Sequence, residues 1–265
     1  MKRWIAALVA LLAVVSLIAC TPAEPAAEPT EAPAEATAEP TEEPAAEPTE
    51  APAEPTEEPA EPTEEPAPEL PAVSVSELFE ALGMVEAEAY DFVCADGYVH
   101  NIIAEDIPAC TIEHVDGRVD ARVPGVGDNT LRSIAYIIPE GLTAETIDPE
   151  GGVQRIIVFE GVVEEYGLAA SEQPRGDETA ADCYSFAEFA DAALWTTPLE
   201  EVQIVATDGY VSAHLYMDIA EKYVSFGHSA APTFAGETAD VNVEPWHMAY
   251  IDLGAEAVVF ADYGA

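Results

Sequence analysis

The folded part of this chain is predicted from short patterned runs of hydrophobic residues that begin near residue 73. Two segments carry apolar residues three and four positions apart, which is the spacing of one helix face. They are 76–82, with Leu78, Phe79 and Leu82, and 185–194, with Phe186, Phe189, Ala190 and Leu194. Ser76 and Ser185 are their predicted N-caps, because a serine hydroxyl can accept a hydrogen bond from a free N–H of the first turn.

Two pairs of β-rich runs each turn at an Asp-Gly dipeptide. The runs 90–94 and 98–103 flank Asp96 and Gly97, and the runs 202–206 and 210–215 flank Asp208 and Gly209. Glycine adopts a positive φ without strain and aspartate tolerates one, so each pair predicts a β-hairpin. Further strands are expected at 133–137, 153–159, 247–251 and 257–260.

These patterns occur twice in the same order, which indicates an internal duplication. The Asp-Gly-Tyr-Val tetrads begin at Asp96 and Asp208, and the Ala-Tyr-Ile blocks begin at Ala135 and Ala249. The predicted fold class is therefore α+β, as two tandem modules of mixed or antiparallel sheet with short helices. Their expected bounds are 73–160 and 184–265, joined by the acidic segment 161–183.

The N-terminus has the features of an export signal. Lys2 and Arg3 precede an apolar stretch of about 15 residues, which is shorter than the roughly 20 residues of a spanning helix. The run ends in Leu-Ile-Ala-Cys and resembles the bacterial lipobox, which implies cleavage after residue 19 and a lipid on Cys20. An uncleaved anchor helix or an ordinary secretory signal is the alternative. Lipidation would place the protein in the cell envelope, bound to a membrane and facing away from the cytoplasm.

Residues 20–72 are expected to form a disordered stalk behind that anchor. After Cys20 the segment consists almost wholly of Pro, Glu, Ala and Thr in imperfect copies of AEPTEEP, with sixteen glutamates. It has too little apolar surface to offset the entropy lost on folding, and its prolines and like charges keep it extended.

The rest of the chain is strongly acidic. Residues 73–265 hold 36 of the 52 acidic residues and six of the eight Lys and Arg residues, a net charge of −30. This excludes a nucleic-acid partner, because phosphate binding requires a basic surface. The carboxylates are interpreted either as a solvated surface or as ligands of a divalent cation. The candidate calcium loop contains Asp116, Asp120, Asp128 and Asn129, and it lacks the alternating ligands of an EF-hand.

Three cysteines remain once Cys20 carries lipid. In an exported protein, Cys94, Cys110 and Cys183 allow one internal disulfide and one remaining thiol. Cys94 and Cys110 are the nearest pair along the chain, and a link between Cys110 and Cys183 stays open.

Known catalytic motifs are absent from the sequence. No two of the five histidines have a zinc-protease spacing, and there is no nucleophile elbow, P-loop or dinucleotide fingerprint. No catalytic residue and no resident cofactor are therefore predicted; this favours a non-enzymatic role and leaves an enzymatic one open.

The two Asp-Gly-Tyr turns carry a family resemblance. Two sets of residues resemble the later part of the sulfite-oxidase-type molybdopterin-binding domain. The first set is Ala95, Asp96, Gly97 and Tyr98, followed by Ala135 and Tyr136. The second set is Ala206, Asp208, Gly209 and Tyr210, followed by Ala249 and Tyr250. The resemblance implies a scaffold inherited without redox chemistry, because Cys94 does not match the molybdenum-binding cysteine and few basic residues are present to hold a pterin phosphate.

The expected function is a non-catalytic binding role for a small molecule, glycan, cation or protein outside the cell. The residues of the two Asp-Gly-Tyr turns are expected either to shape those turns or to form two matching ligand surfaces. They are Asp96, Gly97 and Tyr98 in the first turn and Asp208, Gly209 and Tyr210 in the second. The alternative function is an oxidoreductase-derived domain that retains molybdopterin or another redox cofactor.

Overall fold

The computed structural model describes residues 72–115, 118–226, 232–240 and 244–260. The predicted signal, Cys20 and the stalk lie outside these residues. None of the helices in the described ranges is long and apolar enough to cross a membrane.

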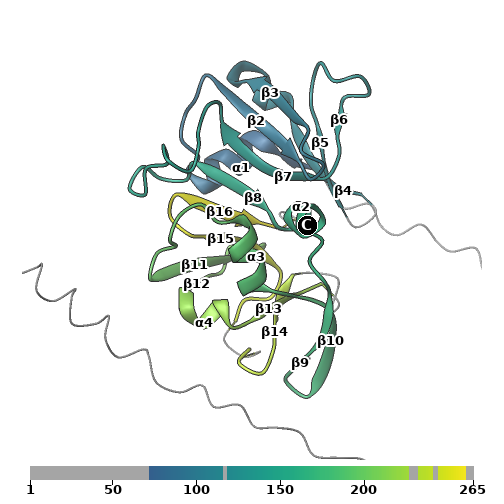
Figure 1. Ribbon diagram of the computed structural model, residues 1–265, viewed down its shortest axis with the longest axis vertical. Coiled ribbons are helices and arrows are strands. Elements are labelled where there is room, and N and C mark those ends of the chain that lie inside the picture. Colours follow the sequence, from purple (N-terminus) through teal and green to yellow (C-terminus); the bar gives the residue numbers. More distant parts are fainter. Residues whose placement is uncertain (1–71, 116–117, 227–231, 241–243, 261–265) are drawn as a thin grey trace, which may run out of the picture. The chain divides into compact units, whose positions relative to one another are not determined.

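An eight-stranded sheet runs through the folded part and places β3 and β12 at its two open edges (Figure 1). Its order is β12-β11-β15-β16-β8-β7-β2-β3, and every neighbouring pair is antiparallel except the central β16 and β8. In that order the strands are Val211–Leu215, Glu201–Ala206, Met248–Asp252, Glu256–Val259, Arg155–Val158, Ile134–Pro139, Ala89–Cys94 and Val99–Ile103.

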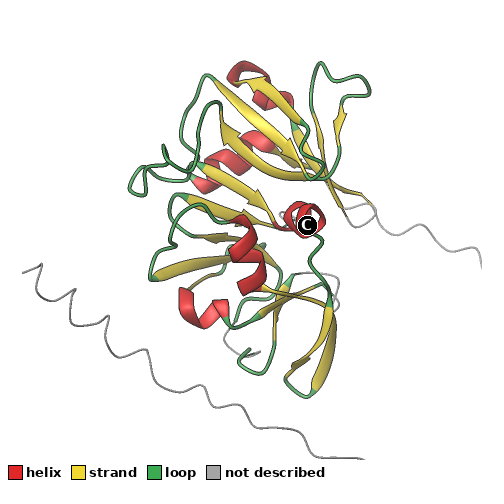
Figure 2. Cartoon of the chain, in the orientation of Figure 1, coloured by secondary structure: helices red, strands yellow, loops and turns green. Residues whose placement is uncertain are grey.

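Two smaller antiparallel sheets and short helices complete the fold (Figure 2). One small sheet contains β1 (Val73–Ser74), β4 (Thr111–Val115), β5 (Arg118–Arg122) and β6 (Thr130–Leu131). The other contains β14 (Thr233–Ala235), β13 (Tyr223–Ser225), β10 (Glu178–Ser185) and β9 (Ser171–Arg175). The helices are α1 (Val75–Leu82), α2 (Phe159–Tyr166), α3 (Phe186–Ala193), α4 (Tyr216–Ala220) and the 3₁₀ helix η1 (Ala104–Ala109).

The central strands separate two hydrophobic cores. Because successive side chains of a strand point to opposite faces, Ile156 and Val158 of β8 enter the first core and Ile157 enters the second. On β16, Ala257 and Val259 join the first core and Val258 joins the second. Both faces of the sheet centre are thus buried, which is why these strands read as continuous apolar runs.

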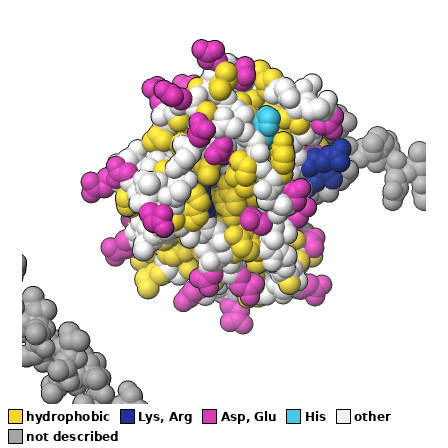
Figure 3. Space-filling view, turned by 45° about the horizontal axis from the view of Figure 1, so that its top comes forward, with side chains coloured by type: hydrophobic (Ala, Val, Ile, Leu, Met, Phe, Trp, Pro, Cys, Tyr) yellow, Lys and Arg dark blue, Asp and Glu magenta, His cyan; other side chains and the backbone are white. Residues whose placement is uncertain are grey.

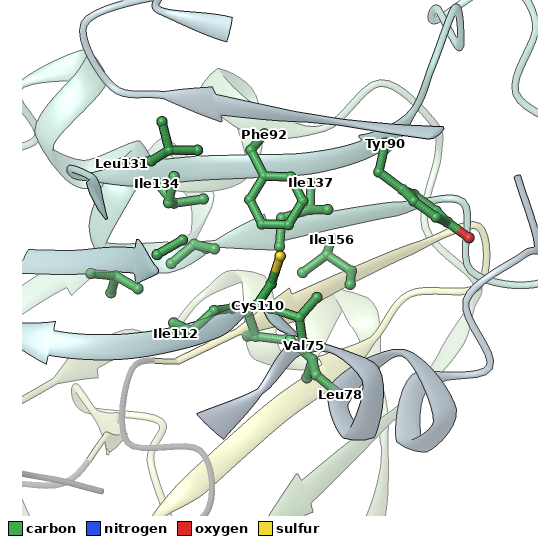
Figure 4. Close-up of a cluster of buried hydrophobic side chains, with 14 of the residues drawn as sticks. Val75, Leu78, Tyr90, Phe92, Cys110, Ile112, Leu131, Ile134, Ile137 and Ile156 are labelled. Carbon is green, nitrogen blue, oxygen red and sulfur yellow. The ribbon is translucent and has the colours of Figure 1, made fainter. Parts of the chain in front are cut away.

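The first core lies between the large sheet, α1 and the small sheet that contains β4 and β5. Val75 and Leu78 of α1 face Phe92 and Ile137 of the large sheet, and Ile112 of β4 closes the cluster (Figure 4). All five side chains are buried, so the apolar face predicted for this helix is its packing face.

The second core is rich in aromatic rings. Phe159 at the start of α2 stacks on Phe189 of α3 at 4.5 Å, and it also contacts Phe226 and Phe260. Helices α2, α3 and α4 together with β13 and β14 supply the layer over this face of the sheet.

Gly161 lets α2 approach β7 closely. A Cβ atom at this position would lie 1.9 Å from the backbone oxygen of Ile134. A side chain there would therefore push the helix away from the sheet.

The helix starts are confirmed in one case and corrected in the other. Ser185 caps α3, since its hydroxyl accepts a hydrogen bond from the N–H of Glu188. The predicted N-cap Ser76 is wrong: the cap is Ser74, two residues earlier, and α1 begins at Val75. Ser74 Oγ accepts from the N–H of Glu77 and also bonds Ser76 Oγ.

The predicted α+β class is confirmed, with strands dominating, and both expected hairpins are present. The regions expected to be separate modules contribute four strands each to one continuous sheet. The segment 161–183, expected as a join, contains most of α2, all of β9 and most of β10.

Candidate binding surface

The two Asp-Gly turns have the same local geometry. Asp96 Oδ1 accepts from the N–H of Tyr98 at 2.9 Å, and Asp208 Oδ1 accepts from the N–H of Tyr210 at 2.9 Å. Gly97 has φ +83° and Gly209 has φ +84°. Each carboxylate is thus hydrogen-bonded within its own turn, as an Asx-turn requires, so turn shaping accounts for both aspartates.

The fold does not bring these two turns together. The hairpins that carry them stand at opposite edges of the large sheet, with β15, β16, β8 and β7 between them. At about 4.8 Å per strand, β2 and β11 are about 24 Å apart. The predicted residues therefore form two separate surfaces.

One face of the β2–β3 hairpin is uncovered. Alternation places Phe92 and Ile102 in the first core, so Val93, Val99 and Ile103 point to the opposite face. Val99 is 51% exposed and Ile103 is 50% exposed.

The β11–β12 hairpin repeats this arrangement at the other end of the sheet. Val202 and Ile204 enter the second core, which leaves Val211 and Leu215 on the opposite face. These two side chains are 50% and 42% exposed. The apolar residues exposed on the two outer strands are thus matched in position and in character.

The backbone N–H and C=O groups of β3 that do not pair with β2 point to the open edge of the sheet, along the strand that carries Val99 and Ile103. Cys94 N–H donates to the oxygen of Tyr98 and Ala104 N–H donates to the oxygen of Glu88. In an antiparallel pair, alternate residues exchange bonds with the partner strand. His100 and Ile102 therefore pair with β2, and the backbone groups of three residues point to the open edge, namely Val99, Asn101 and Ile103.

Strand β12 has the same register. Ala206 N–H donates to the oxygen of Tyr210, and Tyr216 N–H donates to the oxygen of Glu200, each at 2.9 Å. By the same alternation, three residues direct their backbone N–H and C=O groups to the open edge, namely Val211, Ala213 and Leu215.

Neither edge strand carries a charged side chain. Their sequences are Val-His-Asn-Ile-Ile and Val-Ser-Ala-His-Leu, within a region of net charge −30. On the face drawn in Figure 3, acidic side chains are spread around the protein and few Lys or Arg side chains are visible. We call the two uncharged strands, 99–103 and 211–215, the open edges.

A buried cation lies near the centre of the sheet. Arg155 is 1% exposed, and its Nε lies 3.1 Å from Oε1 of the equally buried Glu256 at an angle that does not make a hydrogen bond. The central carbon of its guanidinium lies 3.9 Å from the ring centroid of Trp195 and 4.8 Å from that of Tyr136. Cation–π contacts with two rings help to offset its desolvation.

Glu256 also holds the segment that follows α3. Its carboxylate accepts from the backbone N–H groups of Trp195 and Thr196 and from the Thr196 hydroxyl. This one side chain therefore anchors the indole that covers Arg155, and the cluster has a structural role.

Burial shifts the titration of the groups around Arg155. It raises the pKa of Tyr136, and the hydrogen bond to Tyr166 raises it further. Burial also raises the pKa of Glu165, against the opposing effects of its hydrogen bond to Tyr136 and the charge of Arg155. Burial lowers the pKa of Arg155, and the charge of Glu256 opposes that change.

The three described cysteines are free, buried thiols. Cys94 and Cys110 belong to the first core, whereas Cys183 lies in a separate small cluster (Figure 4 shows Cys110). Burial raises the pKa of Cys94 and of Cys110 from 9.0 to about 11. Neither is suited to act as a nucleophile at neutral pH, and the Cys94–Cys110 disulfide stays a prediction.

Two residues of the candidate calcium loop make other contacts, and one lies outside the described ranges. Asp120 pairs with Arg118 and also accepts from the N–H of Ser133, and Asp128 accepts from the N–H of Thr130. Asp116 is not among the described residues. In those ranges no group of three His, Cys, Asp or Glu residues could hold a metal ion. Calcium binding stays a prediction.

The residues present do not fit a molybdopterin. The thiol of Cys94 is 4% exposed inside the first core, where a metal cannot reach it. The buried basic residues are committed to the fold: Arg175 donates to the oxygen of Phe234 and Lys222 pairs with Glu244.

The sequence patterns predict the two hairpins, but the outer strand of each hairpin is not identified from them as a candidate binding surface. The signal was the lack of charge at 99–103 and 211–215 in a chain otherwise rich in carboxylates. The contact between Arg155 and Glu256 had no such signal, because it joins two strands about 100 residues apart.

No protein-family model matches the chain, and neither a curated protein nor a solved structure matches it. The resemblance to the molybdopterin-binding domain therefore stays a prediction.

Proposed function

We propose that this protein is a membrane-anchored extracytoplasmic lipoprotein with a non-catalytic binding role. The observation that carries the binding role is the pair of open edges, each bearing half-exposed apolar side chains in a strongly acidic protein. Unpaired backbone groups beside such side chains can bind an extended partner segment by main-chain hydrogen bonds and apolar contacts. The lipobox-like end at Cys20 and the long acidic stalk support the anchor and a location away from the membrane surface.

We also propose that the folded part consists of two copies of one ancestral unit. Equivalent backbone hydrogen bonds support this: the N–H of Ala95 donates to the oxygen of Ser133, and that of Thr207 to the oxygen of His247. Ser133 and His247 both have a positive φ, at 53° and 56°. The pairing of β2 with β7 and that of β11 with β15 each contain a register shift at the same place, next to Cys94 and Ala206. Two copies would give the protein two similar binding edges.

The anchor is tested by feeding a bacterial host a clickable palmitate analogue while it expresses the full chain. The proposal expects label on the wild-type protein and none on the Cys20→Ser variant, with protease access to residues 73–265 on cells whose outer layer has been opened. Equal labelling of both proteins would contradict the anchor.

The binding role is tested in the same cells with a photo-crosslinking residue at Ile103 or Leu215. The matched control places it at Glu172, an exposed position on β9. We expect discrete adducts from the two open-edge positions and none from the control. Equal adducts at all three positions would mean that the open edges have no special role.

A further inference from the structure

The strands at the sheet edges differ in how well they are protected from pairing with another chain. An exposed edge is normally made short, charged, interrupted by proline or covered. In the small sheets, β1 and β6 have two residues each, β14 is fully buried, and β9 contains Glu172, Pro174 and Arg175. Among the described strands, only β3 and β12 combine an edge position, five residues and no charge or proline.

Acidic side chains stand at both ends of each open edge. Asp96 lies in the turn before β3, and Glu105 and Asp106 follow it in η1. Asp208 lies in the turn before β12, and Asp218 follows it in α4. All five side chains are exposed. A strand that pairs with either edge therefore meets negative charge at both of its ends.

From these observations we infer that each open edge binds an extended, basic segment of a partner protein by adding it to the sheet as a further strand. The inference rests on the binding role proposed above and specifies its partner. Main-chain hydrogen bonds to Val99, Asn101 and Ile103 hold the segment at one edge. Apolar side chains on one face of the segment then cover Val99 and Ile103, and basic side chains meet the flanking carboxylates.

The charge of this chain argues against the two nearest alternatives. A second copy would bring its own net charge of −30 against the same acidic flanks. The stalk is equally unsuited, because the acidic residues beside the open edges repel its glutamates. Its frequent prolines also lack the N–H that a paired strand donates to its neighbour. A basic, extended partner can form hydrogen bonds with the unpaired backbone groups of the edge strand, and its positive charges are attracted by the flanking carboxylates.

The experiment titrates the full chain with a blocked seven-residue peptide of alternating lysine and valine, at low and at high salt. Its control peptides are a glutamate–valine twin and a lysine–valine peptide that is N-methylated at alternate positions. The methylated peptide keeps the charge but cannot complete the ladder. We expect two peptides bound per chain, weaker binding at high salt, and at least tenfold weaker binding of both controls.

Variants assign the two sites. Asn101→Pro removes an outward N–H that β2 does not use, and Ala213→Pro does the same for β12. Each should reduce the stoichiometry from two to one, and the double variant should abolish binding. Glu172→Ala on β9 is the control, since it lies outside both open edges and should bind as the wild type does. Circular dichroism checks the fold, and the methylated peptide keeps the inference testable where a proline variant unfolds.

Two results would overturn the inference. One is equal binding of the methylated and unmethylated peptides, which would mean simple charge attraction. The other is a chain that binds no peptide and dimerises through these edges, which would make a second copy the occupant. A chain that binds no peptide but gives discrete crosslinks from Ile103 or Leu215 would contradict this inference and leave the binding role standing, so the two failures are distinguishable.

Discussion

Arg155 and Glu256 face each other across the two central parallel strands, with Nε and Oε1 3.1 Å apart and both side chains at most 1% exposed. They join strands that come from the two halves of the folded chain. Removing one charge from such a pair leaves the other buried without compensation, which is more costly than losing the attraction itself.

Glu256→Gln should therefore destabilise the protein by about 3–5 kcal/mol, because the charge of Arg155 remains buried and some bonds to the Trp195–Thr196 segment are lost. Urea unfolding of the full chain, followed by tryptophan fluorescence, measures the difference. The double variant Arg155→Met with Glu256→Gln should recover part of it. A single variant as stable as the wild type would show that the pair does not hold the sheet centre.

Gly161→Ala should cost several kcal/mol, because its new Cβ would overlap the backbone of Ile134 and overpacking displaces α2. The matched control is Gly127→Ala, where no atom lies within 4 Å of the added Cβ. The two unfolding midpoints are compared under the same conditions. Similar midpoints would mean that α2 is not held against β7 as described.

The corrected helix cap gives a third prediction. Ser74→Ala should destabilise the protein by about 1 kcal/mol, since the N–H of Glu77 loses its acceptor. Ser76→Ala should cost less, because Ser76 bonds only the hydroxyl of Ser74. The reverse order in chemical denaturation would restore Ser76 as the cap.

Much of the fold was predictable wherever the signal was local. Gly97 and Gly209 fixed the two hairpins because a tight turn needs a positive φ, and Ser185 marked a helix start. The parallel pairing of β8 with β16 carries no local signal, because it depends on which apolar runs meet after the whole chain collapses. Ser74 and Ser76 are equally good caps in sequence, and only the packing of Val75 in the first core decides between them.

The buried thiols predict a loss of stability in alkali. Their pKa values rise from 9.0 to about 11 on folding, so the folded state keeps protons that the unfolded chain releases between those values. Stability from Cys94 and Cys110 is therefore fully present below pH 9 and falls as the pH rises to about 11, by up to about 3 kcal/mol for each thiol.

Unfolding free energies measured from pH 8 to pH 11 test this, with the double variant Cys94→Ala and Cys110→Ala as the reference for tyrosine ionisation. The wild type should show the steeper decline. Equal slopes, with no more thiols alkylated in the unfolded wild type than in the unfolded double variant, would instead indicate that Cys94 and Cys110 are joined as a disulfide.

The central claim is that β3 and β12 are open edges that accept a further strand. Amide hydrogen exchange of the full chain tests it most directly, residue by residue, with and without the lysine–valine peptide. Without peptide, the N–H groups of Asn101 and Ala213 should exchange fast, and those of His100 and His214 slowly. Saturating peptide should slow Asn101 and Ala213 at least tenfold and leave the two histidines unchanged. If the peptide binds and these outward amides still exchange as fast as before, the open edges are not where it pairs and the account is wrong.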